Sequence, residues 1–234
     1  MVDDLTFCDA QRSFNTMGLG LDGVEVIMKQ FDLVPFLTFF EEQNLSTALY
    51  HDTYHAHCVV LNCYEGACFE NLPFLETRAL LLGALFHDFN HSGGVLPDEE
   101  NIKLALEGLE RAQLKHRYYC DVPLSDEELE LAEQAIRITK YPYEAEPITL
   151  AQQIIRDADL MQPYEEDPSV LREQYLGLKS ELELTRGHLE ALDFVNGMRS
   201  WLDEHVRWHT NWAVEKAKVR GWAEIKQRLV GVLN

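Results

Sequence analysis

The segment Leu80–Gly94, LLLGALFHDFNHSGG, contains an apolar run that ends abruptly at the adjacent pair His87-Asp88. Such a run predicts a buried helix whose last turn carries polar side chains into the core. Burying an imidazole beside a carboxylate costs free energy unless both groups are satisfied. A divalent cation satisfies both, because imidazole nitrogen and carboxylate oxygen are common metal ligands. The segment therefore predicts a helical fold with a metal site; the alternative is a purely structural hydrogen bond between Asp88 and His87.

A second candidate segment lies upstream, where His51 and His55 are four residues apart. We expect a long helix from Thr47 to about Glu70, with Ser46 as its N-cap. The spacing of four places both histidines on one face of that helix. This helix would therefore bring two imidazoles to one side of the core.

A third candidate segment lies downstream, where Asp157 and Asp159 interrupt the apolar sequence of a helix expected from Thr149 to Met161. Two residues apart on a helix, these carboxylates point in different directions and cannot both face one ion. The spacing alone leaves open which of them is the ligand.

The rest of the chain is predicted to be helical almost throughout, because no sustained β-branched alternation indicates a sheet. No internal repeat, low-complexity segment or Pro/Gly/Ser-rich linker divides the sequence. We therefore expect a single all-α domain, a helical bundle spanning residues 1–234. Its motif-bearing core would cover about 45–165 and its C-terminal helices about 168–233.

Composition limits the classes of partner. The 234 residues include 20 Lys+Arg against 40 Asp+Glu, a net charge of −20. The electrostatic field of such a negative charge repels polyanions, so we expect no extended nucleic acid as substrate. A small phosphate ester stays possible, because a metal ion supplies strong local positive charge. No apolar run of transmembrane length, no signal peptide, and an odd cysteine count of 5 without a CxxC pair predict a cytoplasmic protein with no membrane association.

The order of these motifs resembles the HD superfamily of metal-dependent phosphohydrolases, and two details resemble its cyclic-nucleotide phosphodiesterase branch. That branch has a His followed four residues later by His-Ala, which matches His51 and His55-Ala56, although Asp52 stands where the branch usually has Asn. It also has His-Asp-x-Asp-His-x-Gly, which matches HDFNHSG at residues 87–93, with Asn in the fourth position. Ala158-Asp159-Leu160 resembles the closing metal motif. The resemblance covers roughly residues 45–165.

The resemblance implies a metal site with four protein ligands for one or two divalent ions, Mn, Mg, Fe, Co or Zn: His55, His87, Asp88 and Asp159. Asp88 would bridge two ions, and Asp157 remains the alternative fourth ligand. His51 would donate a proton to the leaving oxygen, with a structural role as its alternative. His91 would lie beside the bound water or phosphate; its alternative is a helix-capping role.

The implied function is hydrolysis of a small nucleotide phosphodiester, a cyclic nucleotide or cyclic oligonucleotide, by a metal-bound hydroxide with His51 as general acid. A 5′-nucleotidase or dNTP phosphohydrolase on the same site is the alternative enzyme. A nucleotide-binding regulatory module without turnover is the alternative of another class. The branch's purine-clamping Gln has no counterpart here, since no Gln stands shortly before Phe194-Val195. The sequence therefore leaves open the base and the oligomeric state.

Overall fold

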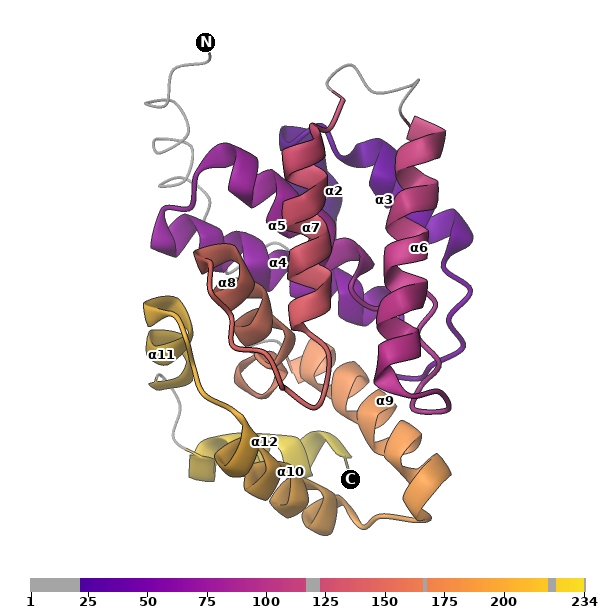
Figure 1. Cartoon of the computed structure of the whole chain (residues 1–234). Coiled ribbons are helices and arrows are strands. Elements are labelled where there is room, and N and C mark those ends of the chain that lie inside the picture. The colour runs from indigo at the N-terminus through magenta and orange to yellow at the C-terminus, as the bar shows by residue number, and fades with distance from the viewer. Residues whose placement is uncertain (1–21, 117–122, 166–167, 219–221, 234) are drawn as a thin grey trace.

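A computed structural model describes residues 22–116, 123–165, 168–218 and 222–233. Within these residues the protein is all-α and has no strand, which confirms the predicted fold class (Figure 1). Cys8 and Cys120 lie outside the described residues. The helices are α2 (Asp22–Gln30), α3 (Val34–Gln43), α4 (Thr53–Glu70), α5 (Phe74–Phe86), α6 (Asp98–His116), α7 (Asp126–Ile138), α8 (Leu150–Asp159), the 3-10 helix η2 (Gln162–Tyr164), α9 (Pro168–Arg186), α10 (Ala191–His205), α11 (Asn211–Lys218) and α12 (Trp222–Leu233).

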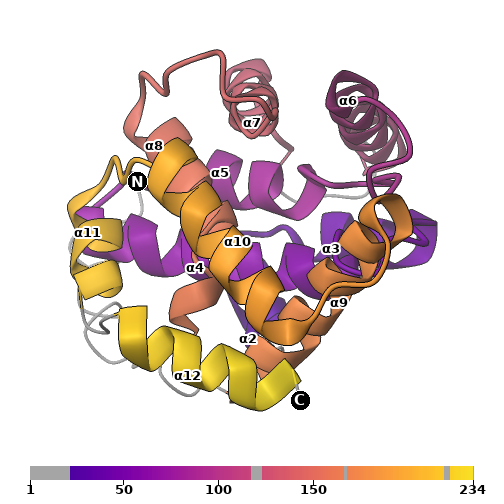
Figure 2. The same cartoon turned by 90° about the horizontal axis from the view of Figure 1, so that it is seen from below.

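Helix α5 is the central element of the core. Its residues from Thr77 to Phe86 are all buried, as the apolar run of the sequence predicts. A helix that is apolar on every side must be covered on every side, and α5 packs against α3, α4, α6, α7 and α8. Figure 2 shows α4 and α5 running through the middle of the molecule, with α6 and α7 beyond α5. The C-terminal end of α5 therefore delivers His87 into the interior.

Helix α8 begins at a reciprocal cap and ends at a candidate ligand. The hydroxyl of Thr149 accepts a hydrogen bond from the Gln152 backbone N–H, and the Gln152 side chain accepts one from the Thr149 N–H. This capping box satisfies two backbone donors at the start of the helix. Ile154 and Ile155 are buried against the core, so Asp159 is held at the last turn with little freedom.

The predicted start of α4 is wrong. The helix begins at Thr53, and its N-cap is Asp52, whose side chain accepts a hydrogen bond from the His55 N–H at 2.9 Å. The Ser46 hydroxyl instead lies 2.9 Å from the carbonyl oxygens of both His51 and His91, and so joins two loops. His51 therefore lies in the non-helical segment before α4 and not one helical turn from His55.

The C-terminal helices cover one side of the core. Helices α9 and α10 both pack against α12, near the C-terminal end of the chain (Figure 1). Helices α9 and α12 also both contact η2. Figure 2 shows α10 crossing in front of α4. Among the described residues, no helix has the length and apolar character needed to cross a bilayer.

Candidate metal centre and active site

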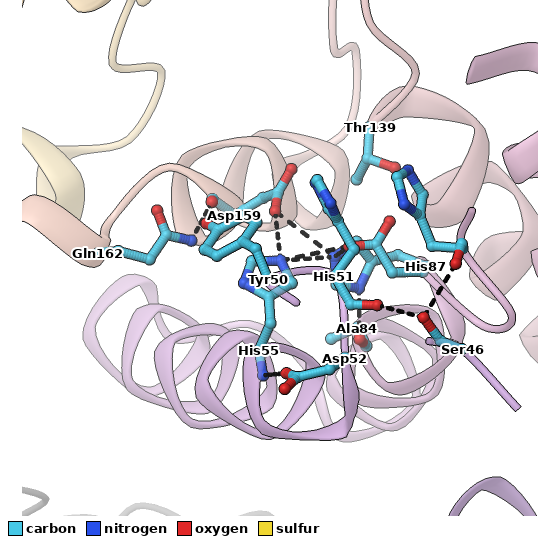
Figure 3. Close-up of polar contacts among 12 residues, drawn as sticks. Ser46, Tyr50, His51, Asp52, His55, Ala84, His87, Thr139, Asp159 and Gln162 are labelled. Carbon is cyan, nitrogen blue, oxygen red and sulfur yellow. Dashed lines mark hydrogen bonds and ion pairs between the residues drawn. The ribbon is translucent and has the colours of Figure 1, made fainter. Parts of the chain in front are cut away.

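Four polar side chains from three helices converge at the C-terminal end of α5. They are His55 on α4, His87 and Asp88 at the end of α5, and Asp159 at the end of α8, and their ligand atoms lie within 4.8 Å of one another. His87 Nε2 lies 3.0 Å from Asp88 Oδ2, and His55 Nε2 lies 3.2 Å from Asp159 Oδ1. The two Nε2 atoms are 3.3 Å apart. Figure 3 shows His55, His87 and Asp159 pointing toward one another.

The other ring nitrogens of the two histidines fix their tautomers. His87 Nδ1 lies 2.8 Å from the carbonyl oxygen of Ala84, and His55 Nδ1 lies 3.2 Å from Gln174 Oε1. Both of these oxygens can only accept, so both Nδ1 atoms carry the hydrogen. In a neutral ring Nε2 then presents a lone pair to the centre of the cluster. This is the arrangement of a metal-binding histidine, whose second nitrogen is held by an outer hydrogen bond.

The cluster therefore fits a divalent cation. Four acceptor atoms, two imidazole nitrogens and two carboxylate oxygens, face one another with no donor between them unless the histidines are protonated. Ligand atoms placed about 2.1 Å from one ion are separated by about 3.0–3.4 Å, and the separations between imidazole and carboxylate atoms here are 3.0–3.5 Å. The group of His55, His87, Asp88 and Asp159 could hold a metal ion.

Protons take the place of the cation when none is bound. Burial alone would lower the pKa of His55, but hydrogen bonds and charge from Asp159 and Asp88 outweigh it and raise the pKa to about 9. Burial likewise opposes ionisation of Asp88, yet the charge of His87 holds the pKa of that carboxyl well below its usual range. A binding metal must displace the protons of the histidines, so its affinity rises with pH.

Asp157 points away from this cluster. Its carboxylate is buried and accepts hydrogen bonds from the backbone N–H groups of His209 and Thr210 and from the Thr210 hydroxyl at 2.8 Å. Burial raises the pKa of Asp157, and these donors partly offset the rise. Asp157 therefore anchors the start of α11, and the different directions predicted for the two aspartates are confirmed.

His51 is held by a residue that the sequence did not reveal. Its Nδ1 lies 2.8 Å from Glu181 Oε2, and its backbone N–H donates to Glu181 Oε1 at 3.1 Å. Burial opposes ionisation of Glu181, but hydrogen bonds from His51 and from backbone groups keep its pKa lowered. A carboxylate only accepts, so Nδ1 carries the hydrogen and Nε2 is left to exchange a proton with a ligand.

His91 lies beside His51 in the loop after α5. The two ring centroids are 3.9 Å apart. His91 Nδ1 accepts a hydrogen bond from the Gly93 N–H at 3.1 Å, and its Nε2 lies 3.7 Å from Asp98 Oδ1. The ring therefore shapes a turn and also borders the cavity described next; it caps no helix among the described residues.

A cavity of about 450 Å³ opens over these groups. Its lining includes Asp88, Asp159, His51 and His91, so two of the four candidate ligands and both candidate catalytic histidines face one space. The volume is in the range of small-molecule sites. The cavity lining also includes the polar residues Asp98, Asn101, Thr139 and Gln162.

Close backbone contact fixes the position of the His51 segment. A Cβ atom at Gly177 of α9 would overlap the carbonyl oxygen of Leu49 and would lie 3.2 Å from Tyr50 Cα. Only glycine lets α9 approach the segment 49–51 this closely. The same approach lets Glu181, four residues and one turn further along α9, reach His51.

We expect Gly177→Ala to lower the free energy of unfolding by about 1–3 kcal/mol, because this buried contact would be overpacked. The hydrolytic activity that the sequence resemblance implies should also fall, since the segment carrying His51 must move away from α9. Gly231→Ala is the matched control, because nothing lies within 4 Å of a Cβ at that position of α12. Thermal unfolding and steady-state kinetics measure both effects. Wild-type stability and activity in Gly177→Ala would contradict the close contact.

Comparison with known proteins shows the fold. No protein-family model matches the sequence, and no curated protein matches it. Among solved structures, the chain is similar to the phosphodiesterase domain of the RhoPDE fusion protein from the choanoflagellate Salpingoeca rosetta. The TM-score is 0.63 at 15% identity, covering 98% of this chain and 90% of that one. The protein therefore has the helical fold of a phosphodiesterase domain, and membership of the HD superfamily stays a prediction.

Proposed function

We propose that the protein is a metal-dependent phosphodiesterase that hydrolyses a small nucleotide, with a cyclic nucleotide or cyclic oligonucleotide as the first choice. The observation that supports this most strongly is the convergence of two imidazole nitrogens and two carboxylates, of which Asp88 and Asp159 line the same cavity as His51, the partner of Glu181. The shared fold with a phosphodiesterase domain supports the same reaction class.

In this proposal His55, His87, Asp88 and Asp159 hold one or two divalent ions. A cation bound there lowers the pKa of a water molecule and neutralises phosphate oxygens. Asp88 lines the cavity, and because one carboxylate can serve two ions, it would be the shared ligand if two ions were bound. The Gln174 amide and the Ala84 carbonyl keep the two imidazoles in the ligating tautomer.

His51 is the proposed general acid. Glu181 fixes the ring and holds the hydrogen on Nδ1, so that Nε2 holds the proton that passes to the leaving oxygen. His91, whose ring lies against that of His51, is proposed to border the scissile phosphate. The net charge of −20 favours a small substrate over extended nucleic acid.

The proposal is tested by incubating the purified protein with Mn and a panel of linear and cyclic nucleotides, and separating the products by chromatography. Opening of a cyclic phosphodiester is the expected result. Release of inorganic phosphate from nucleoside monophosphates, or of triphosphate from dNTPs, would favour the alternative enzymes. Nucleotide binding without any product would favour a regulatory module.

The role of His51 predicts a dependence on the leaving group. His51→Ala should keep its metal and lose about 10²–10⁴-fold in kcat on a nucleotide, as for loss of a general acid. An ester of p-nitrophenol needs little protonation on leaving, so its hydrolysis should fall much less. Metal analysis and parallel assays of the two substrates give the comparison. Equal losses on both substrates would mean that His51 positions the site and is not the acid.

A further inference from the structure

A second cavity, of about 310 Å³, adjoins the first, and we call it the side cavity. Its lining comes from the last turns of α8, from the segment 141–146 and from the segment 204–209 at the end of α10. Tyr141, Tyr143 and Leu160 line both cavities. The candidate metal ligands and the two candidate catalytic histidines do not line the side cavity. Whatever binds there is therefore separate from the proposed substrate.

Arg156, on α8, places a buried positive charge at the side cavity. It is 5% exposed, and its Nε donates to the carbonyl oxygen of Ile138 at 2.8 Å. Its Nη2 also donates to Ile138 and, at 3.0 Å, to the carbonyl oxygen of Ala145. The guanidinium carbon lies 4.2 Å from the centroid of the Tyr143 ring. Among the described residues Nη1 has no hydrogen-bond partner, yet it is not an enclosed atom, so it is open to the cavity.

The charge of Arg156 is only partly compensated within the chain. In the described part of the protein, no carboxylate oxygen lies within 4.0 Å of its guanidinium nitrogens. Burial lowers the pKa of Arg156, and more distant anionic groups, Asp159 and Glu146 among them, oppose this shift. A buried ion is normally paired with an opposite charge. Because the chain has 40 acidic residues against 20 basic ones, a buried arginine without a carboxylate partner suggests that an external anion completes the site.

Further donors surround the opening of the side cavity. Arg207 is exposed and forms no ion pair with any described residue. His205 and His209 also line the cavity, and an imidazole has at least one N–H in either protonation state. These three side chains lie across the cavity from the segment 141–146, so donors approach its interior from more than one wall.

Two carboxylates also line the side cavity, Glu146 and Glu204. Both residues are exposed, so each can turn toward water. Glu204 is also engaged on the surface of α10, where it accepts a hydrogen bond from the Ser200 hydroxyl at 3.2 Å and lies 3.9 Å from His205 Nε2. The buried charge of the cavity is therefore positive, although its rim is mixed.

Adjacent buried side chains of α8 hold both walls of the side cavity in place. Arg156 fixes one wall through the carbonyl oxygens of Ile138 and Ala145. Asp157 fixes the other, because its carboxylate accepts from the backbone N–H groups of His209 and Thr210. A site that is fixed before its ligand arrives loses less conformational entropy on binding.

We propose that the side cavity is a second ligand site, which binds a small anion carrying a phosphate group through Arg156, with Arg207, His205 and His209 as outer donors. Arginine suits phosphate and carboxylate oxygens. Donors on more than one wall favour the tetrahedral phosphate, which has oxygens in several directions, over a planar carboxylate. The volume lies at the lower end of the range for small-molecule sites. The proposal does not depend on the hydrolytic function.

The first test is a calorimetric titration with inorganic phosphate, using Mn-loaded protein freed of excess Mn and, separately, Asp88→Ala. We expect binding with a Kd of about 1 mM or below in both proteins, with sulfate as a competitor. Binding in Asp88→Ala distinguishes the side cavity from phosphate bound at the metal. Binding that disappears in Asp88→Ala, or no binding to either protein, would overturn the proposal.

The second test removes the donors in the Mn-loaded protein. Arg156→Gln should weaken phosphate binding at the side cavity by about 10-fold or more, the usual effect of losing a charged hydrogen-bond donor. Arg156→Lys keeps the charge and should restore part of the affinity. Arg207→Ala, at an exposed position that does not hold the fold, should cost about 2- to 5-fold. Metal content should stay that of the wild type in all three variants.

Arg137→Ala is the matched control, because Arg137 is exposed on α7, pairs with Glu133 and lines neither cavity. Its phosphate affinity should equal that of the wild type. Thermal unfolding shows whether Arg156→Gln is folded; if it is not, Arg207→Ala decides the question. Wild-type phosphate affinity in the folded variants of Arg156 and Arg207 would overturn the proposal.

The third measurement separates two sources of the phosphate group by repeating the titrations with adenosine 5′-monophosphate. Equal affinities for this nucleotide and for inorganic phosphate would identify the free anion as the ligand. Tighter binding of the nucleotide, lost again in Arg156→Gln, would identify a nucleotide whose base contacts Tyr141 or Tyr143. Phosphate and nucleotide binding that are both insensitive to Arg156 would place neither ligand in the side cavity and would overturn the proposal.

Discussion

Asp88→Ala is expected to abolish metal binding and phosphodiester hydrolysis together, with a loss of at least about 10³-fold in kcat/KM. Asp88 Oδ2 lies 3.0 Å from His87 Nε2 and 3.4 Å from His55 Nε2, so it belongs to the centre of the cluster. Removing it takes away one of the four proposed ligands and one of the two carboxylates of the cluster. The metal-linked part of the free energy of unfolding should be lost as well, because metal binding stabilises the folded protein.

Asp203→Ala is the matched control for this prediction. Asp203 is exposed and pairs with Arg199 on the surface of α10, so its loss should cost at most about 1 kcal/mol and leave the activity unchanged. Metal content by elemental analysis and thermal unfolding with and without Mn provide readouts that do not depend on the choice of substrate. Full metal occupancy in Asp88→Ala would refute the assignment of this residue.

The second large effect separates two neighbouring aspartates. Asp159→Asn should lose about 10²-fold or more in kcat/KM, because an amide binds a cation more weakly than a carboxylate and leaves the cluster short of negative charge. Asp157→Asn should keep most of the activity. An amide oxygen still accepts from the backbone N–H groups of His209 and Thr210, so we expect a loss of about 1–3 kcal/mol in stability.

The two variants control for each other, since both replace a carboxylate of α8 by the same amide. Steady-state kinetics and metal content should show the larger loss in Asp159→Asn. Thermal unfolding should show the expected loss of stability in Asp157→Asn, which keeps most of its activity. An inactive Asp157→Asn with an active Asp159→Asn would mean that the fourth ligand has been assigned to the wrong residue.

Much of the fold and the clustering of His55, His87, Asp88 and Asp159 could be predicted because the relevant signals are local. The apolar run of α5 predicts a helix buried on all sides, and the polar pair that ends it must then enter the core. Helical geometry also predicts that the side chains of Asp157 and Asp159 point in different directions, and the structure shows that they do. These inferences need only helical periodicity and the free-energy cost of burying unpaired polar groups.

The segment around His51 could not be predicted in the same way, because either of two residues could serve as the N-cap of α4. Both Ser46 and Asp52 are good N-caps. The structure uses Asp52 to begin α4 and uses the Ser46 hydroxyl to join the loops of His51 and His91. Local sequence does not rank these options, since the choice depends on contacts between segments about 45 residues apart.

The residues that support the site from α9 were also missed. Glu181 and Gln174 lie more than 100 residues from the histidines they contact, in a region where the resemblance to known motifs is faint. Seen alone, an acidic and an amide side chain on an amphipathic helix indicate a solvated face. Only the packing of α9 against the segment 49–51, made possible by Gly177, turns them toward the core.

The most direct test of the central claim is a Mn titration of metal-stripped protein in which bound metal and cyclic-nucleotide hydrolysis are measured in the same samples. We predict that the stripped protein is inactive and that hydrolysis rises in step with occupancy, saturating at one or two ions per chain. Asp88→Ala should neither bind the metal nor hydrolyse the nucleotide. Full hydrolysis by the stripped protein, or stoichiometric metal binding with no hydrolysis of any nucleotide, would contradict the account.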